Sequence, residues 1–142
     1  MKLQNKNAIV TGASTGIGRA VAIELAKEGV VVGLVARNVE KLNETKRLIE
    51  ETGGIAIIFP VDLSDFDSVS ELINDIKSKF DNIDILANIA GIWHGKDEAY
   101  AGKNYELFDP KVITDTFSVG LIAPSLLVRG LLPIMFMGGV CD

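Results

Sequence analysis

The sequence predicts an α/β fold in which helices cover both faces of a parallel, doubly wound sheet. Short apolar runs alternate with amphipathic helical patterns along the 142 residues. The connections between successive apolar runs are long enough for helices, and such connections imply parallel strands with right-handed crossovers. The run at 30–36 is apolar at almost every position, as expected for a strand buried between two layers of helices.

The first half of the chain predicts two strands, each followed by a helix. The first strand, 7–11, ends at a glycine. In the helix after it, the face expected to be buried carries Ile17, Ala20, Val21 and Leu25 at helical spacing. The second strand is 30–36. The helix after it carries an apolar stripe made of Leu42, Thr45, Leu48, Ile49 and Thr52.

The second half continues the alternation and ends in a long helix. The third strand, 55–59, stops at a proline, and 64–67 resembles a capping box. The third helix carries a buried stripe of Val69, Leu72, Ile73, Ile76 and Phe80. A fourth strand is expected at 83–87, followed by a polar loop. Asp109 and Pro110 then supply a cap and a first-turn proline for a helix running to about Met137.

A glycine-rich motif, Thr-Gly-Ala-Ser-Thr-Gly-Ile-Gly at 11–18, joins the first strand to the first helix. The first glycine turns the chain, the second lets the backbone approach a pyrophosphate, and the third lets the helix pack closely. Phosphates would sit on free N–H groups at the positive end of the helix. A turn without a ligand is the alternative. The candidate cofactor-binding residues here are Gly12, Ser14, Thr15, Gly16, Ile17 and Gly18.

The spacing Gly-x-x-x-Gly-x-Gly resembles the TGxxxGxG cofactor motif of the short-chain dehydrogenase/reductase family. Three later segments also resemble family motifs: Asp62-Leu63, Asn88-Ile89-Ala90-Gly91, and the end of the long helix at 131–135. This resemblance covers essentially the whole chain. It implies one Rossmann-type NAD(P)-binding domain over residues 1–142, with its first four strands in the order 3-2-1-4 and a long interface helix.

The resemblance also implies roles for individual residues. Asp62 would accept a hydrogen bond from the adenine amino group, and the Leu63 amide would serve a ring nitrogen. Asn88, Ala90 and Gly91 would line the ribose next to the nicotinamide. Ile89 departs from the motif, where the family has a second Asn, so any polar bond of that Asn is missing. For Asp62, the alternative is a turn or helix cap.

The end of the second strand favours NADP(H) over NAD(H). NAD enzymes of this fold usually place an acid there for the ribose 2′-hydroxyl, whereas NADP enzymes offer an arginine. Here the strand ends Ala36-Arg37, without a carboxylate. Arg37 can fork onto a 2′-phosphate, and one charged hydrogen bond contributes about 1.5–3 kcal/mol. A solvated loop arginine is the alternative.

No catalytic residue is assigned within these 142 residues. The family uses a Ser and a Tyr-x-x-x-Lys pair, but Asn104 and Asp109 stand four residues after Tyr100 and Tyr105. Gly120 stands where the family has a helix Asn that supports a proton relay. We expect the catalytic segment of the family to lie after these residues.

Three functions are therefore open. The first is an oxidoreductase that transfers hydride between NADP(H) and a carbonyl or alcohol, represented here by its dinucleotide-binding part. The second is a non-catalytic NADP(H)-binding module, and the third is an inactive truncated product. A Rossmann-like methyltransferase is a weaker rival, because it would want an acid where Ala36 and Arg37 stand.

Composition narrows the partners. The net charge of −5 argues against nucleic acid as a partner, because binding to its phosphates requires a basic surface. The single cysteine, Cys141, forms no internal disulfide, and His94 has no second metal ligand in evidence, so no metal site is expected. The start of the chain lacks an apolar signal segment, which makes a cytoplasmic location the default.

The apolar stretch at 117–137 contains Arg129 and two prolines, so we expect no membrane span there. A buried helix or a subunit interface explains this stretch better. The long helix, and the fourth strand as a sheet edge, predict a homo-oligomer.

Overall fold

A four-stranded parallel sheet organises the computed structural model, which describes residues 3–92 and 104–135. The strands are β1 (Asn7–Thr11), β2 (Val31–Ala36), β3 (Ile55–Pro60) and β4 (Ile85–Ala87). Their order is β3-β2-β1-β4, and all three pairings are parallel. In the central register, Ile9 lies opposite Gly33 on one side and Leu86 on the other. The predicted fold class and strand order are confirmed.

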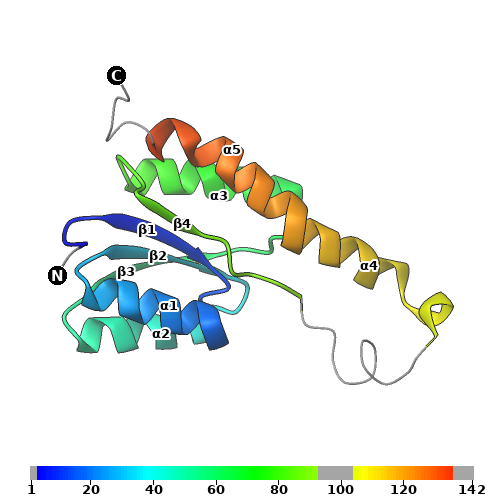
Figure 1. The fold of residues 1–142 in the computed structure, drawn as a ribbon, viewed down its shortest axis with the longest axis horizontal. Helices are drawn as coiled ribbons and strands as arrows, with labels where there is room; N and C mark the ends of the chain where they lie inside the picture. The colour runs from blue at the N-terminus through cyan, green and yellow to red at the C-terminus, as the bar shows by residue number, and fades with distance from the viewer. Residues whose placement is uncertain (1–2, 93–103, 136–142) are drawn as a thin grey trace.

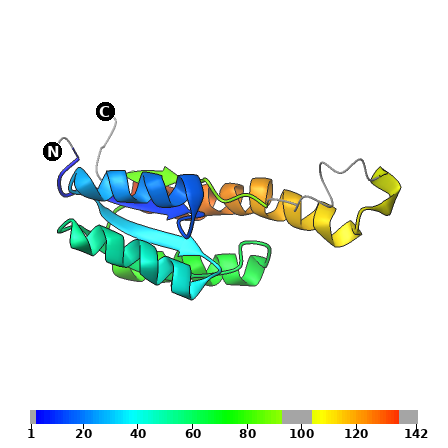
Figure 2. The ribbon, with the colours of Figure 1, turned by 90° about the horizontal axis from the view of Figure 1, so that it is seen from below.

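Two helices cover each face of the sheet (Figures 1 and 2). On one face lie α1 (Gly16–Lys27) and α2 (Val39–Glu51), and on the other lie α3 (Phe66–Lys79) and α5 (Ala123–Met135). Each strand therefore sends alternate side chains into different cores, because successive side chains point to opposite faces. Ala8 and Val10 pack in the cluster with α1 and α2, whereas Ile9 packs in the cluster with α3 and α5.

The first helix buries a different face from the one its apolar residues predict. Ile17 is 74% exposed, and Ala20 is exposed as well. The buried residues are instead the small ones, Gly18, Ala22 and Ala26. The close approach of α1 to the turn after β1 explains this difference: a Cβ on Gly18 would lie 2.1 Å from the carbonyl oxygen of Gly12. Only small residues fit that contact, so the larger apolar side chains lie on the flanks.

The predicted stripes of the other two helices are largely confirmed. In α2, Leu42, Thr45 and Ile49 are buried, whereas Leu48 is half-buried and Thr52 is exposed at the C-cap. In α3, the predicted stripe is buried except for Ile73, which is half-buried. The N-cap of α3 is Asp65, whose carboxylate accepts a hydrogen bond from the backbone N–H of Ser68 at 3.2 Å.

The fourth strand is shorter than expected because its predicted first residue serves another element. The backbone N–H of Ile83 donates to the carbonyl of Ile134 in α5, at 3.1 Å. Ile83 is nevertheless buried in the core that contains α3 and α5. Pairing of β4 with β1 accordingly begins at Ile85.

The long helix is one helical stretch that contains a π-helical turn. It consists of α4 (Pro110–Phe117), the π turn η2 (Ser118–Ile122) and α5, and a short 3-10 helix, η1 (Tyr105–Leu107), precedes it. Pro124 has no N–H to donate to the carbonyl of Gly120, and a π turn is one way for a helix to absorb such a break. The predicted end at Met137 lies outside the described residues.

This helix is only partly buried. Ala123, Leu127 and Leu131 of α5 pack in the core, whereas α4 extends beyond the sheet (Figure 1). By length and composition, Pro110–Met135 could cross a membrane, but one such helix is weak evidence because core helices pass the same test. Three residues of α5 are buried, but only 22% of the most apolar window of the long helix is.

Candidate cofactor-binding site

The four strands end at the same edge of the sheet, and the segments that follow them enclose one cleft. Its volume is about 800 Å³. The direction of strand order reverses between β1 and β4, which is where open α/β sheets bind their ligands. The cleft is lined by Gly12, Ser14, Thr15, Gly16, Ile17, Gly18, Ala36, Arg37, Asn38, Lys41, Val61, Asp62, Leu63, Ile89, Ala90, Gly91, Ile92 and Val119.

The glycine-rich loop, residues 12–15, packs tightly on the segment that follows β4. Gly12 has a φ of +71°, and a Cβ there would lie 3.0 Å from the backbone nitrogen and Cα of Ala90. By contrast, a Cβ on Gly16 would meet nothing within 4 Å. Glycine at position 12 thus allows a close backbone contact. Glycine at position 16 leaves the N-terminus of α1 uncovered on the cleft side.

The first turn of α1 suits an anion. The helix begins at Gly16, and its N-cap residue Thr15 makes no side-chain cap hydrogen bond. The N–H groups of the first turn of a helix have no intrahelical partner and carry the positive end of its dipole. No acidic residue lies in that turn to compete for them. A phosphate group fits these donors.

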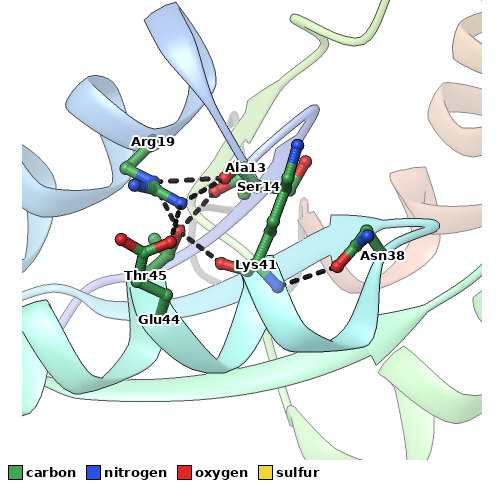
Figure 3. Close-up of polar contacts among 7 residues, drawn as sticks. All are labelled: Ala13, Ser14, Arg19, Asn38, Lys41, Glu44 and Thr45. Atoms are coloured by element: carbon green, nitrogen blue, oxygen red, sulfur yellow. Dashed lines mark hydrogen bonds and ion pairs between the residues drawn. The ribbon is translucent and has the colours of Figure 1, made fainter.

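Behind the loop, two side chains hold its carbonyl groups (Figure 3). The hydroxyl of Thr45, a fully buried residue, lies 3.0 Å from the carbonyl oxygen of Ala13 and 3.1 Å from that of Lys41, so these two acceptors share its one proton. The guanidinium of Arg19 donates to the carbonyl of Ser14 through Nε at 3.1 Å and through Nη2 at 2.7 Å. The same guanidinium also reaches the Thr45 hydroxyl at 3.0 Å and the Glu44 carboxylate at 2.8 Å.

Two cations lie at the end of β2, and neither forms an ion pair within residues 3–92 and 104–135. Arg37 follows the strand directly, and Lys41 lies one turn into α2. Asn38 caps α2 by accepting a hydrogen bond from the backbone N–H of Lys41 at 2.9 Å (Figure 3). Our sequence interpretation included Arg37 and missed Lys41. The signal that could have found Lys41 is its place four residues after Arg37, in the first turn of a helix capped by Asn38.

Asp62 lies after β3 with one carboxylate oxygen engaged and the other open. Its Oδ1 accepts hydrogen bonds from the Ser64 backbone N–H at 3.0 Å and from the Ser64 hydroxyl at 2.8 Å. Mainly because of that backbone N–H, the pKa of Asp62 lies below its ordinary value, and Arg37 and Lys111 add attraction. No donor in the described part of the chain reaches Oδ2. Through Oδ1, Asp62 therefore stabilises the turn after β3. Its Oδ2 remains able to accept a hydrogen bond from a ligand.

The segment after β4 is held by Thr11, which we had not singled out from the sequence. The Thr11 hydroxyl oxygen accepts hydrogen bonds from the backbone N–H groups of Ile89 and Ala90, at 3.0 and 3.1 Å. The side chain of Ile89 packs against the core formed with α1 and α2. At the position where the family motif has a polar Asn, this chain thus makes an apolar contact. Asn88 is exposed and is not among the cleft residues.

The remaining candidates lie away from the cleft or outside the described residues. Tyr105 is 72% exposed in η1, and a Cβ on Gly120 would meet nothing within 4 Å. Tyr100, His94 and Cys141 lie outside the described residues. Among the residues that the structure describes, no group of three potential metal ligands comes together.

The parallel sheet, its strand order and the glycine-rich loop at the switch point define a nucleotide-binding domain of the Rossmann type. Comparison with known proteins identifies the family: the short chain dehydrogenase model matches residues 6–140. The chain therefore belongs to the short-chain dehydrogenase/reductase family, whose members are NAD(P)-dependent oxidoreductases.

Individual relatives agree with this assignment. A short chain dehydrogenase from Pseudocercospora fijiensis is 37% identical over 135 residues, which are 94% of this chain and 42% of that protein. A metagenomic short-chain oxidoreductase, solved in complex with NADP, has a TM-score of 0.86 at 34% identity, over 97% of this chain and 60% of its own. The L-sorbose reductase from Gluconobacter frateurii, solved with NADPH and L-sorbose, has a TM-score of 0.84 at 32% identity. This match covers 96% of this chain and 50% of the reductase. The chain thus spans between 42% and 60% of these relatives.

Proposed function

We propose that residues 1–142 form the dinucleotide-binding unit of an oxidoreductase that uses NADP(H) to interconvert a carbonyl and an alcohol. The observation that carries this proposal is the cleft itself, because three kinds of binding group meet in it. The first turn of α1 offers N–H groups for the pyrophosphate, Arg37 and Lys41 offer cations, and Asp62 offers an open acceptor for the adenine amino group. When bound, the nicotinamide would supply or accept the hydride.

The charge at the end of β2 supports NADP(H) over NAD(H). A ribose 2′-hydroxyl would favour a carboxylate at this position, but the strand ends in Ala36. A 2′-phosphate would find Arg37 and Lys41 on the same side of the cleft, with no carboxylate paired to either in the described residues. Arginine binds phosphate through a planar fork and lysine binds it as a point charge, so the two can act together.

The same cleft offers sites for the rest of the cofactor. The Leu63 amide would serve an adenine ring nitrogen, and Ala90 and Gly91 would line the nicotinamide ribose. We retain Asn88 as a candidate for that ribose, although it is exposed at the end of β4. Two relatives, solved with NADP and with NADPH, support the choice of ligand.

Removal of Arg37 tests the cofactor preference. Arg37→Ala should weaken NADPH binding about ten- to hundredfold, the contribution of one charge-assisted hydrogen bond or slightly more, and leave NADH nearly unchanged. Calorimetric titration of both dinucleotides measures this. Arg47→Ala is the matched control, because Arg47 lies on α2 and pairs with Glu51 away from the cleft. An equal loss for NADPH and NADH would reject the assignment of Arg37.

A non-catalytic NADP(H)-binding module is the second candidate, and a test for turnover separates the two. These 142 residues contain no Tyr-x-x-x-Lys pair to supply a positioned acid, an effect typically worth about 10²–10⁴-fold in rate. Consumption of NADPH by this chain against a panel of carbonyl compounds separates the two. We expect binding without turnover; turnover that follows the purified chain would show that an acid elsewhere in it does the chemistry.

A further inference from the structure

The glycine-rich loop is held from behind by Arg19 and Thr45, two residues that do not line the cleft. Arg19 comes from α1 and Thr45 from α2, so each of these two helices contributes one side chain that binds the loop (Figure 3). Three donor contacts, at 2.7–3.1 Å, reach two neighbouring carbonyls of the loop, and the Thr45 hydroxyl shares its one proton between Ala13 and Lys41. This arrangement fixes the orientation of two peptide planes beside the cleft.

The orientation of those planes decides which groups the loop presents to a ligand. In a planar trans peptide the C=O and the following N–H point in opposite directions. The carbonyl of Ala13 points to Thr45, so the N–H of Ser14 points away from α2. The carbonyl of Ser14 points to Arg19, so the N–H of Thr15 points away from that guanidinium. Neither N–H has a hydrogen-bond partner in the described part of the chain, and both residues line the cleft.

We propose that Arg19 and Thr45 are positioning residues for the cofactor, which turn the N–H groups of Ser14 and Thr15 toward its phosphates. This inference rests on the proposed function. If either peptide rotated by half a turn, a carbonyl oxygen would face the phosphate in place of an N–H, and the two negative groups would repel each other. Holding the carbonyls back thus keeps the loop ready for an anion before the anion arrives.

The ion pair between Arg19 and Glu44 orients the guanidinium and contributes little to global stability. The two side chains are 22% and 50% exposed, and exposed ion pairs are weak. The hydrogen bond from Arg19 lowers the pKa of Glu44, so the carboxylate remains charged near neutral pH. Direct binding of phosphate by Arg19 is disfavoured, because its Nε and Nη2 are already engaged and the residue is not part of the cleft lining.

Binding of NADPH and NADH by variants of these residues tests the proposal. Arg19→Met should weaken the binding of both dinucleotides by about tenfold, roughly the contribution of one charge-assisted hydrogen bond. Thr45→Val should weaken both by about two- to tenfold, the contribution of a neutral hydrogen bond. Thr45→Ser keeps the hydroxyl and should restore binding. Arg19→Lys keeps the positive charge but lacks the planar guanidinium, so its binding of both dinucleotides should remain weak. Arg47→Met, which removes an equally charged residue from α2, should bind as the original protein does.

A second readout separates positioning from general destabilisation. In NMR spectra, the amide signals of Ser14 and Thr15 should shift on addition of NADPH to the original protein and respond less in Arg19→Met, while the thermal midpoint changes little. Unchanged affinity in Arg19→Met, or full binding by Arg19→Lys, would overturn the proposal and leave the cofactor site intact. Failure of the original protein to bind either dinucleotide would overturn the proposed function and this inference together.

Discussion

At the scale of single residues, Asp84 shows how one carboxylate joins distant parts of the chain. It accepts hydrogen bonds from Lys6 Nζ at 2.9 Å, from the Asn7 backbone N–H at 2.8 Å and from Asn82 Nδ2 at 3.1 Å. Burial alone would raise the pKa of Asp84, but these donors outweigh burial and lower it. The carboxylate therefore ties the start of β1 to the approach to β4 in its ionised form.

Replacement of Asp84 should make stability less dependent on pH. Because the folded-state pKa lies below the ordinary 3.8, the carboxylate contributes stability above that pH, and the contribution is lost as pH falls through the lower folded value. Asp84→Asn should lower the free energy of unfolding by about 1–2 kcal/mol at pH 7, because an amide N–H₂ would face a donor. Urea unfolding at pH 7 and pH 3 measures both values.

The deficit of Asp84→Asn should shrink at pH 3, because below the ordinary value of 3.8 the unfolded chain binds a proton and the contribution of the folded-state carboxylate declines. Asp75→Asn serves as the control, because Asp75 is exposed on α3 and its side chain has no hydrogen bond in the described residues. A deficit of equal size at both pH values would show that the charge of Asp84 does not matter.

Residues of the site could be predicted where their position next to a strand is enough to place them. Arg37 follows β2 directly and Asp62 lies two residues after β3. The ends of parallel strands meet at one edge, so both residues were found. Arg19 and Thr45 could not be found in this way. Their roles depend on the crossing of two helices behind the loop, a tertiary arrangement that leaves no local pattern.

At the scale of elements, apolar periodicity predicts that a helix exists better than it predicts which face is buried. The stripes of α2 and α3 were largely correct because their large apolar residues do meet the core. In α1 the prediction was only partly right: Ile17 is exposed and Leu25 is half-buried against the core. Gly18 makes the closest contact, with the carbonyl of Gly12 just after β1. The π turn was likewise beyond a simple helical pattern.

Two glycines of the long helix should respond to alanine with opposite signs. A Cβ at Gly120 meets nothing within 4 Å, so Gly120→Ala should stabilise the protein by about 0.5–1 kcal/mol through helix propensity. A Cβ at Gly130 would lie 2.6 Å from Ile73 Cδ1, so Gly130→Ala should destabilise it by about 1–3 kcal/mol through overpacking. Chemical unfolding of both variants, side by side, measures the difference. Stabilisation by Gly130→Ala would mean that α5 does not pack on α3 as described.

At the scale of the whole molecule, apolar side chains remain uncovered along the long helix. Phe117 and Leu121 lie one turn apart and are 58% and 59% exposed, and Val128 is 41% exposed. Within the described residues, β4 pairs only with β1, so its other edge offers free N–H and C=O groups. Exposed apolar patches and open strand edges both favour association.

We therefore predict that the protein forms a homodimer or a larger species. Light scattering across a range of concentrations measures its mass in solution. Leu121→Asp should shift the equilibrium toward monomer, because association would bury the new charge. Phe66→Asp is the matched control, since Phe66 is 45% exposed at the start of α3, away from that patch. A single monomeric species at high concentration would contradict the prediction.

A crystal structure of the protein with NADP⁺ would show where the dinucleotide binds. We expect the pyrophosphate on the N–H groups between Ser14 and Gly18, with the 2′-phosphate within hydrogen-bond distance of Arg37. We also expect the adenine amino group on the open oxygen of Asp62. A dinucleotide bound elsewhere on the molecule, or a 2′-phosphate that touches neither Arg37 nor Lys41, would contradict this expectation.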